Sequence, residues 1–373
     1  MYFFRKYSDQ ITGYLFIFPA VFLITIFGIF PVFFGIYMSF HKWKVFKGRF
    51  LGFENYYKIL GDISSFFLFV LGLLILIFSY WLWSEFKERI KHKAIFFISI
   101  LLLVLIAFFI INSSWSNMLI LGDEDFLNSL IYTFYYSFFT ITLEVGLGLI
   151  IAFALYQKLK GKQFFQMILL FPYITPAVMG AAVFFIIFGK AENSLLNEFI
   201  GLFGYDPQLW LFDKRPITEV LFGVKINGFL AGPSLALTSA IIYGIWSYTG
   251  YYAIILLAGL SIIPTELYDA AKSEGASRWQ IFIKITIPLL TPIIFFLLLT
   301  GFINTFQAFN HIFIMKTSSA GSTMNVVTIE IFDHFWDRVK FGYAAAEAVV
   351  LFILLNVLAI SQYVLFRKRL NYE

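Results

Sequence analysis

The sequence of 373 residues contains no cysteine, which excludes disulfides, thiolate catalysis and cysteine metal sites. It has only four histidines, at His41, His92, His311 and His334, and none has the spacing of a helical zinc motif. It also lacks the glycine-lysine loop that binds ATP and the serine and H-E-x-x-H motifs of hydrolases. We therefore expect no catalytic residue, no metal site and no cofactor of its own, and we expect that the chain is not an enzyme.

Charged residues are scarce. They make up 13% of the chain, whereas apolar residues make up 60% and the mean hydropathy is +0.84. Soluble domains have roughly 25% charged residues, so this composition indicates that lipid is the solvent. The net charge of +5 does not point to nucleic acid as a partner, because the basic residues lie in short clusters beside apolar runs. We expect a multi-pass membrane protein.

Long apolar runs are expected to form one spanning helix each, because lipid offers the backbone no other hydrogen-bond partner. We count eight such runs and expect an all-α fold with about eight transmembrane helices. The runs are 12–40, 64–84, 94–112, 127–156, 164–188, 233–262, 288–309 and 342–366. The first run is longer than the apolar part of a signal peptide and has no small-residue cleavage site after it, so we expect it to be retained.

Basic clusters indicate the orientation of these spans. With eight spans, the clusters near the N-terminus (Arg5 and Lys6), at 87–93, at 158–162 and at 367–369 fall on one side. The loop 122–125 on the other side is acidic. The positive-inside rule then places both termini on the cytoplasmic side of the membrane. We expect this membrane to be a bacterial-type plasma (inner) membrane. A fifth cluster, which follows the first span, disagrees, and we let the other four outweigh it.

A polar stretch at 264–287 lies between two long apolar runs, on the cytoplasmic side in this topology. Its centre has small residues with a charge at each end: Asp269, Ala270, Ala271, Lys272, Ser273, Glu274, Gly275 and Ala276. Pro264 suits the first turn of a helix, and Gly275 permits a backbone turn that other residues resist. Because alanines allow close approach and acids can pair with a basic surface, we expect a short helix that docks on a partner protein.

This stretch resembles the EAA loop of ATP-binding-cassette importer permeases, whose pattern is E-A-A-x-x-D/E-G-A followed by I-x-L-P. The downstream part is present as Ile285 and Pro288, and Asp269 stands where the family has glutamate. The shorter acid would weaken the pairing without abolishing it. The resemblance implies that a separate ATPase subunit binds ATP and magnesium and grips this loop. The residues implied in coupling are Asp269, Ala270, Ala271, Glu274, Gly275 and Ala276.

Other segments resemble the carbohydrate branch of these permeases, of the maltose and glycerol-3-phosphate type. They are Phe18-Pro19-Ala20 with Pro31, Gly52–Tyr56, Phe171–Pro176, Trp210–Asp213, Gly259–Tyr268 and Phe341–Ala346. The resemblance implies a type I core of six helices, two ATPase subunits and a second, similar permease subunit, expected to form a heterodimer. It also implies an extracytoplasmic solute-binding protein and a sugar or polyol as the substrate. Residues 317–323 replace a glycine-rich run of the family, which weakens the expected contact with the delivery protein.

The resemblance divides the chain into three parts. Residues 1–60 hold the first transmembrane helix and an outer loop, and residues 125–373 hold the permease core with the coupling loop at 264–287. Residues 61–124 insert two further transmembrane helices. Lipid contact, subunit packing and an accessory partner are all open as roles for this insert.

Polar and aromatic residues in the sixth and seventh spans are candidates for the substrate pathway. Asn304, Gln307 and Asn310 are three apart, so we expect them to lie on one helical face. Tyr248 and Tyr252 are four apart in the sixth span. Amides can bond to hydroxyl groups and aromatic rings stack on sugars. The resemblance implies a sugar-binding position near Tyr252, Phe306, Gln307 and Asn310. The alternative is that the amides tie neighbouring helices together.

Two acids in the spans leave other functions open. Glu144, deep in the fourth run, could relay protons in an ion-coupled secondary transporter, bind substrate or simply be hydrogen-bonded. Glu347 lies near the outer end of the eighth run, where we expect it to reach water. A membrane-embedded enzyme or scaffold would need a reactive cluster that faces water, and the sequence offers none.

Overall fold

The computed structural model describes residues 8–86, 93–157, 159–192, 194–226 and 228–370. Among these residues, seven helices are long and apolar enough to cross a membrane, and a bent pair of helices makes an eighth span if it is counted as one. The prediction of an all-α membrane fold with about eight transmembrane helices is confirmed. Several basic residues used for the orientation lie outside the described residues: Arg5, Lys6, Lys87, Arg89, Lys91, His92 and Lys158.

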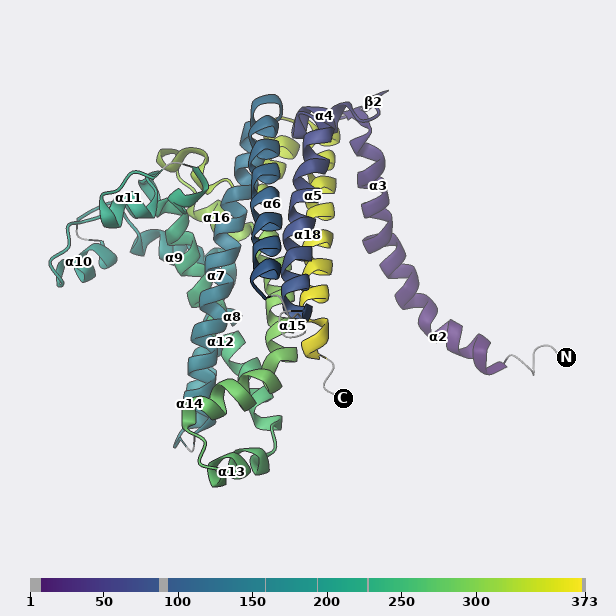
Figure 1. Ribbon diagram of the computed structural model, residues 1–373. Helices are drawn as coiled ribbons and strands as arrows, with labels where there is room; N and C mark the ends of the chain where they lie inside the picture. The colour runs from purple at the N-terminus through teal and green to yellow at the C-terminus, as the bar shows by residue number, and fades with distance from the viewer. Residues whose placement is uncertain (1–7, 87–92, 158, 193, 227, 371–373) are drawn as a thin grey trace.

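The first span is one long helix, made of α2 (Ser8–Ile24), the π-helical turn η1 (Thr25–Ile29) and α3 (Phe30–Ser39). In Figure 1, α3 runs near α18 and α2 diverges from the rest of the molecule. Residues 12–34 are all exposed. An apolar helix with so little contact to its own chain has to be covered by lipid or by another subunit.

A short β-hairpin and a helix cap one end of the molecule. They are β1 (His41–Trp43), antiparallel β2 (Lys47–Phe50) and α4 (Glu54–Leu60). The side-chain amide of Asn55 donates a hydrogen bond of 2.7 Å to the carbonyl of Ser39, which fixes α4 against the end of α3. The strands are too short for an alternating pattern to be visible in the sequence.

The inserted pair of helices is a hairpin of α5 (Ile63–Phe86) and α6 (Lys93–Leu121), which pack against each other and lie beside α18 (Figure 1). The chain enters and leaves this hairpin at one point, because the amide of Asp123 donates a 3.0 Å hydrogen bond to the carbonyl of Ile59. Gly61 and Gly122 make this neck possible, since a Cβ on either would collide with the backbone of the other.

The centre of the molecule is the contact between α7 (Glu124–Tyr156) and α12 (Leu235–Ile262), which lie side by side over their length. The helices α15 (Ile287–Phe306) and α18 (Phe341–Leu370) complete this bundle. Buried apolar side chains fill the space between them. Because these helices face one another, residues far apart in the sequence meet at the same depth.

The fifth span is not the continuous helix predicted for 164–188. It consists of α8 (Lys162–Ile174) and α9 (Ala177–Ile187), which are bent by 91° relative to each other. Pro176 supplies no backbone N–H and forces Thr175 out of the helical region, to φ −65° and ψ 128°. The bend therefore follows from this proline.

The seventh span differs from the predicted 288–309 at both ends, since it runs from Arg278 to Phe306. It is built from α14 (Arg278–Ile281), the π-helical turn η4 (Phe282–Thr286) and α15. Ser277 and Gln280 form a capping box, which starts the helix within the stretch expected to be a loop. The π-helical turn accommodates Pro288, which cannot donate to the turn before it.

Short helices fill the segments between the spans. They are α10 (Leu195–Gly201), η2 (Trp210–Phe212), α11 (Ile217–Phe222), η3 (Gly228–Ala231), α16 (Asn310–Met315), η5 (Ser318–Met324), α17 (Val327–Phe332) and η6 (Asp333–Asp337). Buried residues of α12, α16 and η5 form one apolar core at the end of the bundle where α16 and η5 lie.

Candidate functional site: a docking helix and a break in a span

The predicted docking segment contains α13 (Thr265–Ser273), which projects at the end of the molecule opposite α4 (Figure 1). Within the coupling residues, Asp269, Ala270, Glu274 and Gly275 are exposed, and Ala271 and Ala276 are half-buried. Lys272 pairs with Asp269 at 3.0 Å, but both side chains face solvent and such pairs contribute little to stability. The helix thus presents small residues and acids at its exposed surface.

The end of α13 has a Schellman motif. The amide of Ala276 bonds to the carbonyl of Ala271 at 2.9 Å, and the amide of Gly275 bonds to the carbonyl of Lys272 at 3.0 Å. Gly275 has a left-handed φ of +81°, a conformation that is costly for residues with a side chain. This position explains why a glycine ends the docking helix.

The docking helix is tied to two spans. Only Ile263 and Pro264 separate the end of α12 from α13, and α14 begins at Arg278. The hydroxyls of Tyr268 and Thr286 lie 3.3 Å apart, which links α13 directly to the start of the seventh span. The helix α13 is therefore joined to both α12 and the seventh span.

A hollow of about 410 Å³ lies beside the end of α13. Its lining includes the small residues Ala271 and Gly275 and the polar residues Gln280 and Lys284. Trp279 is 68% exposed nearby and stacks on Phe282 with the ring centres 5.6 Å apart. The hollow and the exposed ring together form a surface that can receive another polypeptide.

The predicted amide row of the seventh span is broken. The helix α15 ends at Phe306, Gln307 is its C-cap, and Asn310 begins the separate helix α16. The statement that Asn304, Gln307 and Asn310 share one helical face is therefore wrong. All three side chains are nevertheless exposed, so the break presents amides to whatever covers this surface.

Burial separates the predicted pathway residues into two groups. Tyr252 is 4% exposed and Phe306 is 5% exposed, whereas Tyr248, Gln307 and Asn310 are accessible. The hydroxyl of Tyr252 donates to the carbonyl of Leu297 at 3.4 Å and occupies the space beside Gly301. Tyr252 therefore fills the junction of α7, α12 and α15, and its part in the pathway stays a prediction.

Tyr248 belongs to an aromatic group at the bend of the fifth span. Tyr173 stacks on Tyr251 with ring centres 4.5 Å apart and meets Tyr248 edge-on at 5.5 Å. Reasoning from the sequence did not include Tyr173 among the candidates, although it lies inside the Phe171–Pro176 motif. Half-exposed aromatic rings next to the bend can stack on a flat apolar surface.

A comparison with protein families decides what this arrangement belongs to. Residues 144–372, more than half of the chain, match the family described as binding-protein-dependent transport system inner membrane component. The chain belongs to this family. The match includes α13, the bent span and the helix break, and it begins after the inserted hairpin.

Relatives of this inner membrane component support the assignment. The chain is 28% identical to the trehalose/maltose transport system permease protein MalF of Thermococcus litoralis over 63% of its own length and 72% of the relative. It is 28% identical to the arabinooligosaccharides transport system permease protein AraP of Bacillus subtilis, over 66% and 73%. It is 27% identical to the sn-glycerol-3-phosphate transport system permease protein UgpA of Agrobacterium fabrum, over 68% and 80%.

Solved structures show the same fold. A crystal structure of a bacterial ABC transporter involved in the import of the acidic polysaccharide alginate aligns with a TM-score of 0.66 at 15% identity. The alignment covers 99% of both chains. The inner membrane component is therefore a permease subunit with the fold of an ABC importer, and it is a multi-pass protein of the inner membrane.

Two acids of this permease are buried, which was expected for Glu144 and not for Glu347. Glu144 is 2% exposed on α7 and lies against Tyr252. Glu347 was expected to reach water, which is wrong, because its exposure is 0%. The segments α17 and η6 pack against α18 and cover this acid. No local pattern in the sequence indicates this cover, since it comes from residues folded back over α18.

Proposed function

We propose that this permease imports a sugar or a related polyol that an extracytoplasmic solute-binding protein delivers. The support is the function of its relatives, which belong to transport systems for trehalose and maltose, arabinooligosaccharides or sn-glycerol-3-phosphate. The accessible amides of Gln307 and Asn310 and the ring of Tyr248 suit a ligand that has hydroxyl groups on apolar faces. Their position at a bend and a break follows the common use of interrupted helices in transporters.

The observation that carries the proposal is α13 with its exposed small residues and glycine-dependent end. Two separate ATPase subunits bind ATP and magnesium, and one of them receives α13 in a cleft. Asp269 and Glu274 pair with basic groups of the ATPase, while Ala270 and Ala271 allow close contact. Because α13 is joined to α12 and to the seventh span, closure of the ATPases moves both helices as rigid bodies.

A second permease subunit completes the membrane part. The exposed apolar surface of residues 12–34 and the uncovered amides at the helix break are the features that favour such a partner. Polar side chains inside a membrane are expensive against lipid, so a pathway between two subunits explains their exposure. In this arrangement α13 and both termini are cytoplasmic, and the acidic residues 123–125 face the outside.

The experiment is reconstitution of the transporter in proteoliposomes. The permease is co-purified with a second permease and the ATPases encoded beside it, and the subunits are counted by mass spectrometry. We expect two ATPase chains and two permease chains, and uptake that needs both ATP and the solute-binding protein. Uptake without ATP, or a permease that purifies with no ATPase, would contradict the proposal.

A further inference from the structure

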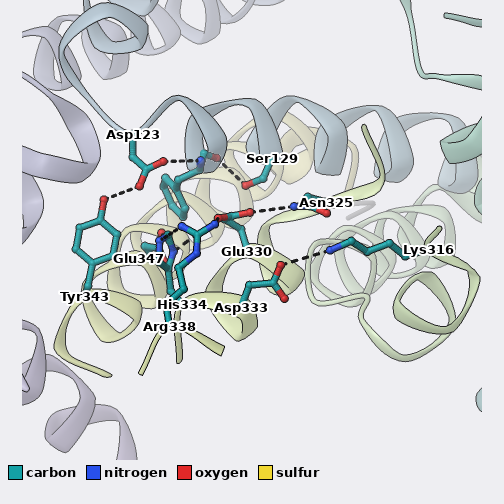
Figure 2. A network of polar contacts seen from close by, with 11 residues as sticks. Asp123, Ser129, Lys316, Asn325, Glu330, Asp333, His334, Arg338, Tyr343 and Glu347 are labelled. Atoms are coloured by element: carbon teal, nitrogen blue, oxygen red, sulfur yellow. Dashed lines mark hydrogen bonds and ion pairs between the residues drawn. The ribbon is translucent and has the colours of Figure 1, made fainter. Parts of the chain in front are cut away.

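The first turns of α7 and α18, together with α17 and η6, enclose a group of ionisable side chains (Figure 2). Asp123 caps α7, Glu330 lies in α17, His334 lies in η6 and Glu347 lies in α18. The last three side chains are at most 1% exposed. Four segments thus bring acids and an imidazole into one dry place.

The distances within this group are those of a ligand cluster. Nδ1 of His334 lies 2.9 Å from Oε1 of Glu347 and 3.8 Å from Oε1 of Glu330. One oxygen of Asp123, one oxygen of Glu347 and one nitrogen of His334 all lie within 4.8 Å of one another. Tyr343 donates a 2.7 Å hydrogen bond to Oδ2 of Asp123 and so orients that carboxylate, as supporting residues do at metal sites.

Several ligand atoms have no hydrogen bond within the part of the chain that the structure describes. They are both oxygens of Glu347, Oε1 of Glu330 and Nδ1 of His334, and all are shielded from solvent. The close pair of His334 and Glu347 lacks the alignment that a hydrogen bond requires. A buried polar atom without a partner costs free energy, and a buried carboxylate costs more. These atoms therefore call for a cation between them.

The charges point to the valence of that cation. The cluster contains three carboxylates, those of Asp123, Glu330 and Glu347. It contains one guanidinium, that of Arg338, whose Nη2 lies 3.5 Å from Oε1 of Glu330. Asp333 does not alter the balance, since Lys316 pairs with it at 3.4 Å. Lys340 and Asp125, which also face the cluster, carry opposite charges. The formal excess is two negative charges, which a divalent ion neutralises.

We propose that Asp123, His334 and Glu347 bind a divalent transition-metal ion, such as Zn²⁺ or Mn²⁺, with Glu330 beside them. One imidazole with several carboxylates is a donor set that suits these ions, whereas Ca²⁺ and Mg²⁺ prefer oxygen alone. The ion clamps the start of α7, next to the neck of the inserted hairpin, to α18 and η6. It is a structural site, and no transport step runs through it.

Arg338 competes with this ion for His334. Its Nη1 lies 2.7 Å from Nε2 of the imidazole, and because a guanidinium only donates, Nε2 accepts and the ring proton sits on Nδ1. Coordination through Nδ1 places the ring proton on Nε2, so Arg338 has to leave this contact. Arg338 is 43% exposed and already approaches Glu330, so it has somewhere to turn. Loss of Arg338 should therefore strengthen metal binding.

The test uses the full-length permease in detergent, stripped with EDTA and then titrated with Zn²⁺ or Mn²⁺. Bound metal is counted by elemental analysis and the thermal midpoint is recorded with and without the ion. We expect an equimolar amount of ion and a midpoint raised by several degrees. Glu347→Gln should lose both effects, and Glu144→Gln, a matched change of a buried acid elsewhere, should keep both.

Three results would overturn the site. One is equal metal binding by the wild type and Glu347→Gln, which means adventitious binding at other residues. Another is a midpoint that no metal changes while Glu347→Gln raises it, which means that protons and not a metal balance the charge. If Glu347→Gln fails to fold, Arg338→Gln decides, because its Kd for Zn²⁺ should fall severalfold and an unchanged or higher Kd contradicts the site.

Discussion

The backbone amide of Ala276 donates a 2.9 Å hydrogen bond to the carbonyl of Ala271, which closes α13 around the left-handed Gly275. The direction in which the chain leaves the docking helix is therefore set by hydrogen bonds and not by chance contacts. Because α14 and the seventh span follow at once, the same bond fixes how α13 stands relative to the membrane helices. The proposed docking of α13 on an ATPase depends on this local geometry.

Removal of the amides at the helix break should slow uptake. Gln307→Leu and Asn310→Leu each take away a side chain that can bond to a sugar hydroxyl, which costs about 1–3 kcal/mol, or roughly tenfold in uptake, if the partner is left unpaired. The control is Asn356→Leu, which changes an exposed amide of α18 away from the break. Initial rates in proteoliposomes that match the wild type for both pathway variants would remove these residues from the pathway.

The energy source of uptake distinguishes an ATP-driven permease from an ion-coupled secondary transporter. Glu144→Gln keeps the size and the polarity of the buried side chain beside Tyr252, so we expect ATP-driven uptake to persist in this variant. We also expect wild-type uptake to continue when ionophores collapse the ion gradients. Uptake that stops in both experiments would make Glu144 a proton carrier and favour the secondary transporter.

His311 predicts a specific dependence of stability on pH. Burial lowers the pKa of His311 from the ordinary 6.5 to about 4. The unfolded chain then binds the proton more tightly, so stability is complete above pH 6.5 and decreases as the pH falls towards 4. His311→Gln still offers the hydroxyl of Tyr136 a partner, which in the wild type lies 2.7 Å from Nε2. Between pH 7 and pH 5 we expect this variant to lose about 2 kcal/mol less than the wild type.

The check is the thermal midpoint of both proteins in detergent at the two pH values. The comparison of differences cancels the contribution of every other titrating group that the variant leaves unchanged. If the midpoint of His311→Gln drops as far as that of the wild type, His311 does not titrate in this range.

The inserted hairpin should be removable. Its neck is closed by the 3.0 Å hydrogen bond between Asp123 and Ile59, so joining Gly61 directly to Gly122 needs little movement of the core. The deletion removes two spans, so every other segment stays on the same side of the membrane. We expect the shortened chain to insert and to elute as a single species, with a midpoint lowered by the lost contacts to α18. Aggregation or failed insertion would show that the hairpin is needed for folding.

Parts of the fold could be predicted from the sequence because lipid imposes a simple rule on the backbone. Seven of the eight long apolar runs formed one spanning helix each, the run 164–188 formed two helices, and the polar stretch with Gly275 formed a short exposed helix between spans. The bend at Thr175 and Pro176 was not predicted, since apolar content alone does not show where a proline breaks a run. The end of α15 at Phe306 was missed for a similar reason, because apolar residues continue beyond the helix.

The buried polar cluster could not be predicted at all. Asp123, His334 and Glu347 are far apart in the sequence, and no local spacing relates them. Glu347 looked accessible because its depth was judged along its own helix, while the cover comes from α17 and η6. Tertiary packing decides which side chains are buried, and local patterns in one sequence do not show that packing.

Coupling of the permease to its ATPases through α13 is tested by a comparison of Gly275→Asp with Gly161→Asp in the reconstituted transporter. Gly161 is a matched control, because its φ of +78° is also left-handed, a Cβ there also meets open space, and it lies outside α13. For Gly275→Asp we expect the permease to be made, ATPase to be lost on purification, and ATP-driven uptake to fall by at least about tenfold, as for a misplaced coupling element. Gly161→Asp should keep both. Normal uptake and normal ATPase retention in Gly275→Asp would contradict the account.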